Sequence, residues 1–138
     1  MSDPIEPFDR TARRRARDRA APDFARFAFL KDALAADLAE RLAELGPSFP
    51  HILDLGSHDG RLAALLPESE IVAADAGFHF AKMAHGVMCD EDRLPFAPGS
   101  FDAVLSAASL HGVNDLPGAL VQIRQVLKPG GVFLAAFV

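Results

Sequence analysis

Short apolar runs alternate with amphipathic segments along most of this chain, and the alternation predicts strands separated by helices. Runs that fit buried strands occupy 51–55, 70–74, 87–89, 101–106 and 132–138. Apolar residues recur at helical spacing in 116–127, and shorter helical turns are expected at 61–66 and 78–85. Strands that are apolar throughout are typical of a parallel sheet with helices on both faces. The pattern therefore predicts a doubly wound parallel α/β sheet.

The first part of the chain has a different pattern and predicts two helices. Residues 10–20 alternate Arg with Ala, which favours a helix, and Pro22 should end it. Asp23 is placed to cap a second helix, whose apolar stripe leaves Lys31 on the polar side. The stripe consists of Phe27, Leu30, Leu34, Leu38, Leu42 and Leu45. We divide the chain into a basic arm and helix at 1–22 and a sheet domain at 23–138.

Charge is distributed unevenly along the chain. Residues 1–31 hold eight Lys and Arg against five Asp and Glu, whereas the remainder holds six against fourteen, for a net charge of −5. The acidic remainder argues against nucleic acid as a partner. We expect the arginines to form a solvated helix face, with an acidic partner or RNA as the alternative.

Other features bear on location. No apolar run reaches the roughly 18 residues of a membrane helix, and the N-terminus lacks the apolar segment of a signal peptide. The single cysteine, Cys89, cannot form an internal disulfide and is expected to be a small core residue. These features predict a cytoplasmic protein without a membrane partner.

The stretch 51–60 reads as a buried strand followed by a glycine-flanked turn. Asp54 lies two residues before Gly56, and Gly60 follows four residues after that glycine. Glycine permits a sharp turn and the close approach of a ligand to the backbone. A strand that enters a helix through such a turn directs N–H groups at one spot, as nucleotide sites require. The spacing D-x-G-x-x-x-G differs from the dinucleotide pattern G-x-G-x-x-G, so an ordinary strand-to-helix turn is the alternative.

Acidic residues follow three successive predicted strands. Asp54 ends the first strand, Asp75 ends the second, and Asp90 follows the third. Ligands of such sheets bind at the carboxyl ends of the strands, so these side chains should converge on one crevice. Asp75 is placed to accept hydrogen bonds from ribose hydroxyls, and Asp90 from the amine of adenine. Each acid alone is more often a turn or cap residue, but together they indicate a nucleoside cofactor.

The chain resembles the class I S-adenosylmethionine-dependent methyltransferases in a set of motifs within 51–138. These motifs are Ile52-Leu53-Asp54-Leu55-Gly56 with Gly60, then Asp75, Asp90-Glu91-Asp92-Arg93-Leu94-Pro95-Phe96, Ser100-Phe101-Asp102-Ala103-Val104 and Leu127-Lys128-Pro129-Gly130-Gly131. The resemblance implies a Rossmann-like sheet with strand order 3-2-1-4-5, helices on both faces, and S-adenosylmethionine as cofactor. It also implies that the family's C-terminal antiparallel strands are missing here. The last strand would then be an exposed edge that invites self-association.

Matching positions carry the family's cofactor contacts to particular residues. The resemblance implies that Asp54 helps to hold the amino group of the methionine portion, which Gly56 and Gly60 line. It implies that the backbone of Glu91 joins Asp90 at the adenine and that Ser106 lies beside the sulfonium. The complete expected set is Asp54, Gly56, Ser57, Gly60, Asp75, Ala76, Asp90, Glu91 and Ser106.

A further resemblance concerns one branch of this family. Phe8-Asp9-Arg10 and the stretch 109–117 look like the mitochondrial complex I assembly-factor branch and its bacterial relatives. That branch is linked to hydroxylation of a protein arginine; the carrier-protein methyltransferase of biotin synthesis is a more distant relative.

Two positions depart from the expected pattern. His58 replaces a small residue of the glycine turn and could crowd the ligand or point outward. Gly112 stands where the assembly-factor branch has a bulky aromatic and should thin a substrate wall.

The histidines add one candidate for chemistry. None of the five has the spacing of a metal site, so no metal is expected. His111 follows the fourth predicted strand and faces the expected substrate mouth, where it is a candidate base or substrate contact; a surface residue is the alternative.

These features predict a methyltransferase that uses S-adenosylmethionine and acts on a small molecule or a protein. A methyl transfer is a displacement at an already activated carbon, so catalysis would be mainly positioning. The alternative is a non-catalytic or truncated S-adenosylmethionine-binding module related to the assembly factors. A nicotinamide oxidoreductase is a third hypothesis, which the missing G-x-G-x-x-G pattern disfavours.

Overall fold

A five-stranded parallel sheet in the order β3-β2-β1-β4-β5 forms the centre of the structure, a computed structural model that describes residues 6–46 and 48–137. The strands are β1 His51–Leu55, β2 Glu70–Asp75, β3 Val87–Met88, β4 Phe101–Ala107 and β5 Leu127–Ala136. The predicted fold class and strand order are confirmed. Residues 1–5 of the predicted arm and Val138 of the last predicted strand lie outside the described residues.

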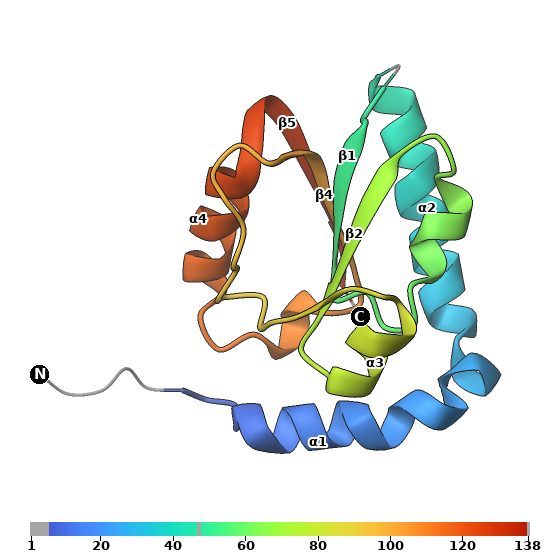
Figure 1. Ribbon diagram of the computed structural model, residues 1–138, viewed down its shortest axis with the longest axis vertical. Helices are drawn as coiled ribbons and strands as arrows, with labels where there is room; N and C mark the ends of the chain where they lie inside the picture. Colours follow the sequence, from blue (N-terminus) through green and yellow to red (C-terminus); the bar gives the residue numbers. More distant parts are fainter. Residues whose placement is uncertain (1–5, 47, 138) are drawn as a thin grey trace, which may run out of the picture.

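Helices cover both faces of the sheet and one of its ends (Figure 1). The α-helices are α1 Arg10–Ala20, α2 Phe29–Leu45, α3 Phe78–Met83 and α4 Leu116–Val126. The 3₁₀ helices of the described ranges cover Ala21–Phe27, Arg61–Leu65 and Leu110–Gly112. Among the helices within the described ranges, none is long and apolar enough to cross a membrane.

The core consists of two apolar layers, because side chains alternate between the faces of a strand. Leu53 and Leu55 of β1 pack with Ile123 of α4 on one face. Ile52 packs with Leu38 of α2 on the other. Both faces are therefore buried, as a parallel sheet with crossover helices requires.

The second helix begins later than the sequence predicts. Asp23 lies in the first turn of the 3₁₀ helix, and α2 begins at Phe29 without a side-chain cap. The buried stripe of α2 is also shifted, because Lys31 is 4% exposed whereas Leu30 is 42% and Leu45 is 56% exposed. The prediction that Lys31 lies on the polar side is wrong.

Residues 128–131, which separate the predicted helix at 116–127 from the predicted strand at 132–138, are part of β5. Phe101 of β4 pairs with Leu127, whereas Ala103 pairs with Val132, so extra residues of β5 bulge out between the two pairs. Gly130 has a left-handed φ of 78° at this point, which glycine adopts without a steric penalty. The strand therefore begins at Leu127 rather than at the predicted residue 132.

Candidate functional site

The carboxyl ends of the strands lie at one end of the molecule, where α1 and α3 lie across them (Figure 1). Asp54 and Asp75 are at the ends of the neighbouring strands β1 and β2. Asp75 pairs with Met88 of β3, and Asp90 follows two residues later. The three carboxylates that the sequence singles out are therefore at the same edge of the sheet.

Asp54 is a buried carboxylate without a hydrogen-bond partner. It is 1% exposed, and neither of its carboxylate oxygens has a partner among the described residues. Burial raises the pKa of Asp54 to about 6, opposed by the charge of Lys31 and reinforced by that of Asp75. A buried polar group without a partner is costly, so this carboxylate is a candidate ligand contact.

Lys31 lies under the same turn and is a site residue that the sequence analysis missed. Its Nζ donates to the carbonyl oxygens of Gly56 and Ala107, each at 2.9 Å. These carbonyls follow β1 and end β4, so Lys31 ties α2 to the point where the two strands end. Burial lowers the pKa of Lys31, against the attraction of Asp54. A lysine in register with the buried Ala35, Leu38 and Leu42 was the available signal.

Asp75 accepts four hydrogen bonds, two on each carboxylate oxygen. Its Oδ1 accepts from Arg17 Nε at 2.9 Å and from the Gly77 backbone N–H at 2.8 Å. Its Oδ2 accepts from Arg17 Nη2 at 2.5 Å and from the His58 backbone N–H at 2.8 Å. The amide donors come from the two loops beside it, and the guanidinium comes from α1.

The carboxylates after β3 are also paired with α1. Glu91 accepts from Arg13 Nη1 and Nη2 at 2.8 and 2.9 Å, and from Ser109 Oγ at 2.5 Å. Burial alone would raise the pKa of Glu91, but Arg13 holds it below its usual value. Arg10 binds both oxygens of Asp92, at 2.7 and 2.8 Å, and Asp90 at 3.1 Å.

Arg10, Arg13, Arg14 and Arg17 recur at helical spacing, so one face of α1 carries all four guanidinium groups. Arg14 Nε donates to the Ala76 carbonyl at 3.1 Å and completes this face. Asp9 caps the start of the helix, because its side chain accepts from the Ala12 N–H at 3.0 Å. The expectation of a solvated arginine face is wrong for these four residues, because carboxylates and a carbonyl of the same chain lie opposite them.

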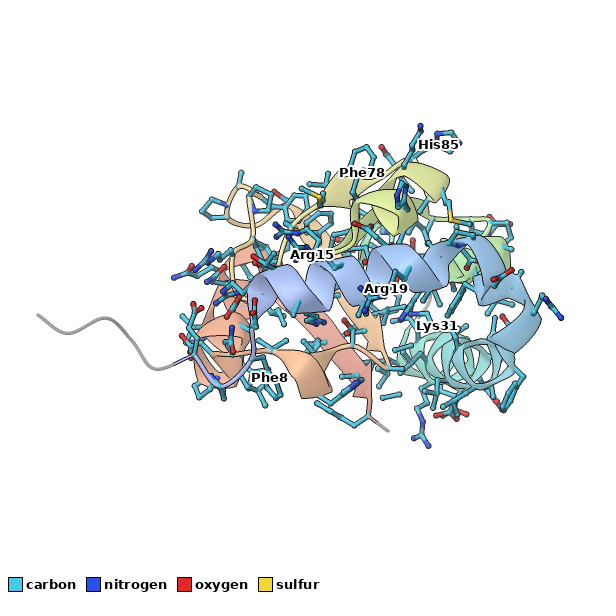
Figure 2. The ribbon with its side chains drawn as sticks, turned by 90° about the horizontal axis from the view of Figure 1, so that it is seen from below. Phe8, Arg15, Arg19, Lys31, Phe78 and His85 are labelled. Carbon is cyan, nitrogen blue, oxygen red and sulfur yellow. The ribbon has the colours of Figure 1, made fainter. Side chains whose placement is uncertain are left out.

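The remaining α1 arginines behave differently. Arg15 and Arg19 are exposed, and neither side chain makes an ion pair or hydrogen bond within the described ranges. Figure 2 shows α1 crossing the carboxyl end of the sheet, with both residues labelled. For these two arginines the predicted solvated face is confirmed.

His58 packs into an aromatic cluster instead of pointing outward. Its ring stacks on Phe24 at a centroid distance of 4.9 Å and meets Phe80 edge-on at 5.2 Å. Burial lowers the pKa of His58 to about 2, and the nearby charge of Arg17 lowers it further. The ring is therefore neutral and helps to line the cavity beneath α1.

A cavity of about 510 Å³ lies between α1 and the loops at the end of the sheet. Phe24, His58 and Phe80 line it together with His111 and Gly112. His111 is exposed in the 3₁₀ helix after β4.

Gly112 has a neighbour that explains its small size. A Cβ at this position would lie 3.2 Å from Arg13 Nε. The space that a larger side chain would use is thus next to the Arg13 side chain, which reaches past it to Glu91.

The glycine turn has the expected left-handed residues, but its inner side is packed by protein. Gly56 has φ 76° and Gly60 has φ 85°. A Cβ on Gly56 would overlap with Ser109 Oγ, so Ser109 occupies the space beside Gly56. The sequence analysis missed Ser109 as a site residue, and its position after β4 was the only signal.

The other expected residues are placed as follows. Ser57 and Ala76 are buried in the loops after β1 and β2, beside Asp54 and Asp75. Ser106 is buried with no hydrogen-bond partner for its Oγ among the described residues. By strand alternation it shares the α4 face with Val104, whereas Asp54 shares the α2 face with Ile52. Ser106 and Asp54 therefore point to opposite faces of the sheet.

Two further findings concern the wider surface. Within the described ranges, no group of three or more His, Cys, Asp or Glu side chains could hold a metal ion.

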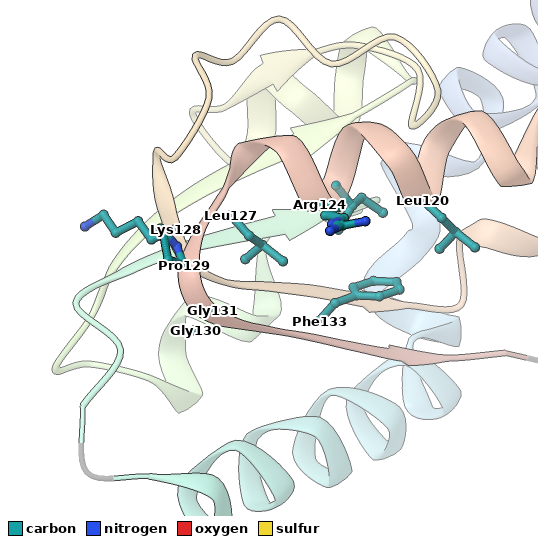
Figure 3. Close-up of a pocket in the computed structure, with 9 residues that line it drawn as sticks. Leu120, Arg124, Leu127, Lys128, Pro129, Gly130, Gly131 and Phe133 are labelled. Carbon is teal, nitrogen blue, oxygen red and sulfur yellow. The ribbon is translucent and has the colours of Figure 1, made fainter.

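A second cavity, of about 500 Å³, lies between α4 and β5 and is lined by Leu120, Leu127 and Phe133 (Figure 3). It is remote from the carboxylates at the end of the sheet.

Curated relatives share this sequence over almost its full length. The chain is 37% identical over 143 residues to "Arginine-hydroxylase NDUFAF5, mitochondrial" of Danio rerio, covering 95% of this chain and 44% of that protein. It is 31% identical over 144 residues to a malonyl-[acyl-carrier protein] O-methyltransferase of Xylella fastidiosa, covering 94% of this chain and 49% of that protein. The chain thus spans about half the length of the curated relatives it matches.

Solved structures share the fold. A chain from the complex between the Haloferax volcanii Trm112 methyltransferase activator and a methyltransferase has a TM-score of 0.74 and 27% identity, covering 88% of this chain and 59% of that one. An S-adenosylmethionine-dependent methyltransferase of Thermotoga maritima has a TM-score of 0.66 at 22% identity, covering 85% and 58%. The family model described as methyltransferase domain matches residues 53–135. The chain therefore belongs to the methyltransferase domain family of class I S-adenosylmethionine-dependent enzymes.

Proposed function

We propose that this chain binds S-adenosylmethionine and transfers its methyl group to an acceptor, either a small molecule or a protein. The observation that carries the proposal is the row of carboxylates at the carboxyl ends of β1, β2 and β3, beside the glycine turn. Family membership makes S-adenosylmethionine the natural ligand of that row. We assign to it Asp54, Gly56, Ser57, Gly60, Asp75, Ala76, Asp90, Glu91 and Ser106.

The donor set fits such a ligand. Asp54 offers a buried carboxylate whose oxygens have no partner among the described residues, which suits the ammonium of a methionine portion. Asp75 offers carboxylate oxygens at the end of β2, where ribose hydroxyls bind in sheets of this kind. Asp90 and the Glu91 backbone follow β3 and suit the adenine.

The role of the protein in methyl transfer is positioning. The cofactor would supply a methyl group already activated by a sulfonium. Asp54 and the turn at Gly56 would fix the methionine end, while Lys31 holds the carbonyls of Gly56 and Ala107 in place. His111 lines the cavity under α1 from an exposed position and is the candidate base or acceptor contact. Orientation of this kind supplies most of the rate enhancement that such a displacement needs.

A second candidate function is a binding or assembly module without turnover. Two observations favour it. Relatives that match 95% of this chain include an arginine-hydroxylase of mitochondria, and the candidate carboxylates are already paired with arginines of α1. A nicotinamide oxidoreductase stays the third and weakest hypothesis, because the turn lacks the G-x-G-x-x-G pattern.

Calorimetry with S-adenosylmethionine, S-adenosylhomocysteine and NAD tests the ligand. We expect the two adenosyl ligands to bind and NAD not to bind. A radiolabelled methyl group then distinguishes enzyme from module when the protein is incubated with a cell extract as the source of acceptors. Incorporation of label supports the transferase, and binding without incorporation supports the module. NAD binding alone would overturn both.

We also propose two properties of the whole protein. The edge strand β5 and the apolar cavity beside it support self-association through the C-terminal strand. The single free cysteine, Cys89, supports a cytoplasmic location, for which cell fractionation is the test. The basic arm and helix at 1–22 and the sheet domain at 23–138 remain our division of the chain.

A further inference from the structure

The four-arginine face of α1 lies on the carboxylates that we assign to the adenosine. Three of its arginines form two-point ion pairs: Arg17 with Asp75, Arg13 with Glu91 and Arg10 with Asp92. No residue of α1 is itself buried. The helix is therefore held at the end of the sheet mainly by charge, and only weakly by apolar packing.

The Arg17–Asp75 ion pair and a bound ribose cannot be present at the same time. An ionised carboxylate has about four lone-pair sites, and Asp75 uses four: two for the amides of His58 and Gly77, and two for Arg17. The amides belong to the loops that shape the turn. A ribose hydroxyl can therefore bond to Asp75 only if the Arg17 guanidinium leaves.

The residues after β3, on the adenine side, are covered by the same helix. Both of its oxygens are bonded to Arg13, and Oε1 also accepts from Ser109. Asp90, at the expected adenine amine, bonds to Arg10 at 3.1 Å. The α1 face thus covers the ribose and adenine positions at once, while the carboxylate of Asp54 is left without a partner among the described residues.

The surface under α1 is shaped to receive it. A Cβ on Gly77 would lie 3.0 Å from Arg17 Cβ, and a Cβ on Gly112 would lie 3.2 Å from Arg13 Nε. Two glycines therefore face two of the arginines that make ion pairs. A helix that rested on the sheet without a specific fit would not need small residues opposite its side chains.

We propose that α1 competes with the adenosyl ligand. The closed helix and the bound nucleoside use the carboxylates of Asp75 and Asp90, so ligand binding releases Arg17 and Arg10 and lifts α1 from the end of the sheet. This inference rests on the proposed function, because it concerns the same site. The lifted helix presents guanidinium groups that the closed state hides. Ligand binding and exposure of a basic helix face are thus coupled.

The coupling has an unusual salt dependence. Salt screens ion pairs at partly exposed positions, and the arginine side chains that face the carboxylates are 14–38% exposed. Raising the ionic strength should weaken the closed state and thereby strengthen binding of S-adenosylhomocysteine. A site in which the arginines themselves hold the ligand would show the reverse.

Calorimetric titration with S-adenosylhomocysteine is the test. Arg17→Met should tighten its binding roughly fivefold or more, the lower end of ordinary coupling between sites. Arg15→Met and Arg19→Met remove the same charge from the same helix at exposed positions that have no partner within the described ranges, and should leave the affinity unchanged. Equal or weaker binding by Arg17→Met, in a protein whose circular dichroism is unchanged, overturns the competition.

Hydrogen exchange provides a second measurement on the unaltered protein. Saturating S-adenosylhomocysteine should speed exchange of the α1 amides and leave those of α2 unchanged. Slower exchange in α1 would mean that the helix closes over the ligand, which contradicts the proposal.

The outcomes also separate this inference from the proposed function. Asp75→Asn in the Arg17→Met background tests the adenosyl site itself, and should weaken binding roughly tenfold or more because a charge-assisted hydrogen bond is lost. If that loss is seen while Arg17→Met alone gives no gain, the site stands and the competition fails. If neither the wild type nor Arg17→Met binds the ligand, both proposals fail.

Discussion

Lys31 and Asp54 are buried groups of opposite charge beneath the glycine turn. Both are almost fully buried, and burial shifts the pKa of each toward its neutral form. The lysine makes two hydrogen bonds to backbone carbonyls, whereas the aspartate makes none with described residues. The two residues therefore contribute differently to stability, and each supports a prediction.

Replacement of Lys31 by Met should destabilise the protein strongly. The change leaves the carbonyls of Gly56 and Ala107 without their donor and Asp54 without its compensating charge. The expected loss is roughly 2–6 kcal/mol in the free energy of unfolding, because two buried carbonyls lose their donor at about 1–3 kcal/mol each. Urea denaturation measures it. Lys82→Met, at an exposed position of α3, is the control and should stay within about 0.5 kcal/mol of the wild type.

Replacement of Asp54 by Asn should change how stability depends on pH. The pKa of Asp54 rises from 3.8 to about 6 on folding, so between these values the folded state binds the proton more tightly than the unfolded state. Asp54 therefore lowers stability as pH rises through that window. Asp54→Asn removes this term, and its stability relative to the wild type should increase from pH 4 to pH 7. A difference that stays constant across urea denaturations in this range would contradict the assignment.

At the scale of elements, α2 anchors the sheet face that carries Asp54. Leu38 is 2% exposed and packs against β1, so Leu38→Ala should cost roughly 2–4 kcal/mol of unfolding free energy. Leu45→Ala makes the same change on the same helix at a residue that is 56% exposed, and should cost far less. Thermal or urea unfolding compares the two. Equal losses would mean that α2 does not pack as described.

The elements that were predicted correctly are those with a local signal. Apolar runs predicted the five strands, because a few consecutive residues are enough to indicate a buried strand. Their order came from the family resemblance and not from the runs. The start of α2 was not predicted, since Asp23 looks like a cap in sequence but lies in a 3₁₀ turn. Leu30 and Lys31 were assigned to the wrong faces of α2. Helical spacing shows that one face of a helix is apolar, but a stripe shifted by one residue fits the same sequence almost as well.

The site was predicted in part for a similar reason. The positions of Asp54, Asp75 and Asp90 followed from the rule that parallel strands end at one edge. The ion pairs of Arg13 and Arg17 join residues that are 78 and 58 positions apart. A short sequence pattern cannot predict a pairing over such a distance. The arginines could therefore be identified as a charged helix face, but not matched to their carboxylates.

At the scale of the whole molecule, β5 is an unpaired edge of the sheet that the structure describes. Phe137 follows this strand and is 55% exposed. Phe137→Lys should reduce self-association, because a charge at a sheet edge opposes pairing with another chain. Sedimentation velocity over a dilution series measures it. Phe29→Lys, at a 79% exposed residue of α2, is the control and should associate like the wild type. A wild type that is monomeric at every concentration would contradict association through β5.

The contact between Arg13 and Gly112 links the first helix to a loop that is distant in the chain. A designer who wished to rebuild an aromatic wall at residue 112 would push against the Arg13 side chain, whose Nε would lie 3.2 Å from the first carbon of the new side chain. Such a change alone would disturb the ion pair between Arg13 and Glu91. Mutant libraries that aim to reshape the cavity beneath α1 should therefore vary residues 13 and 112 together.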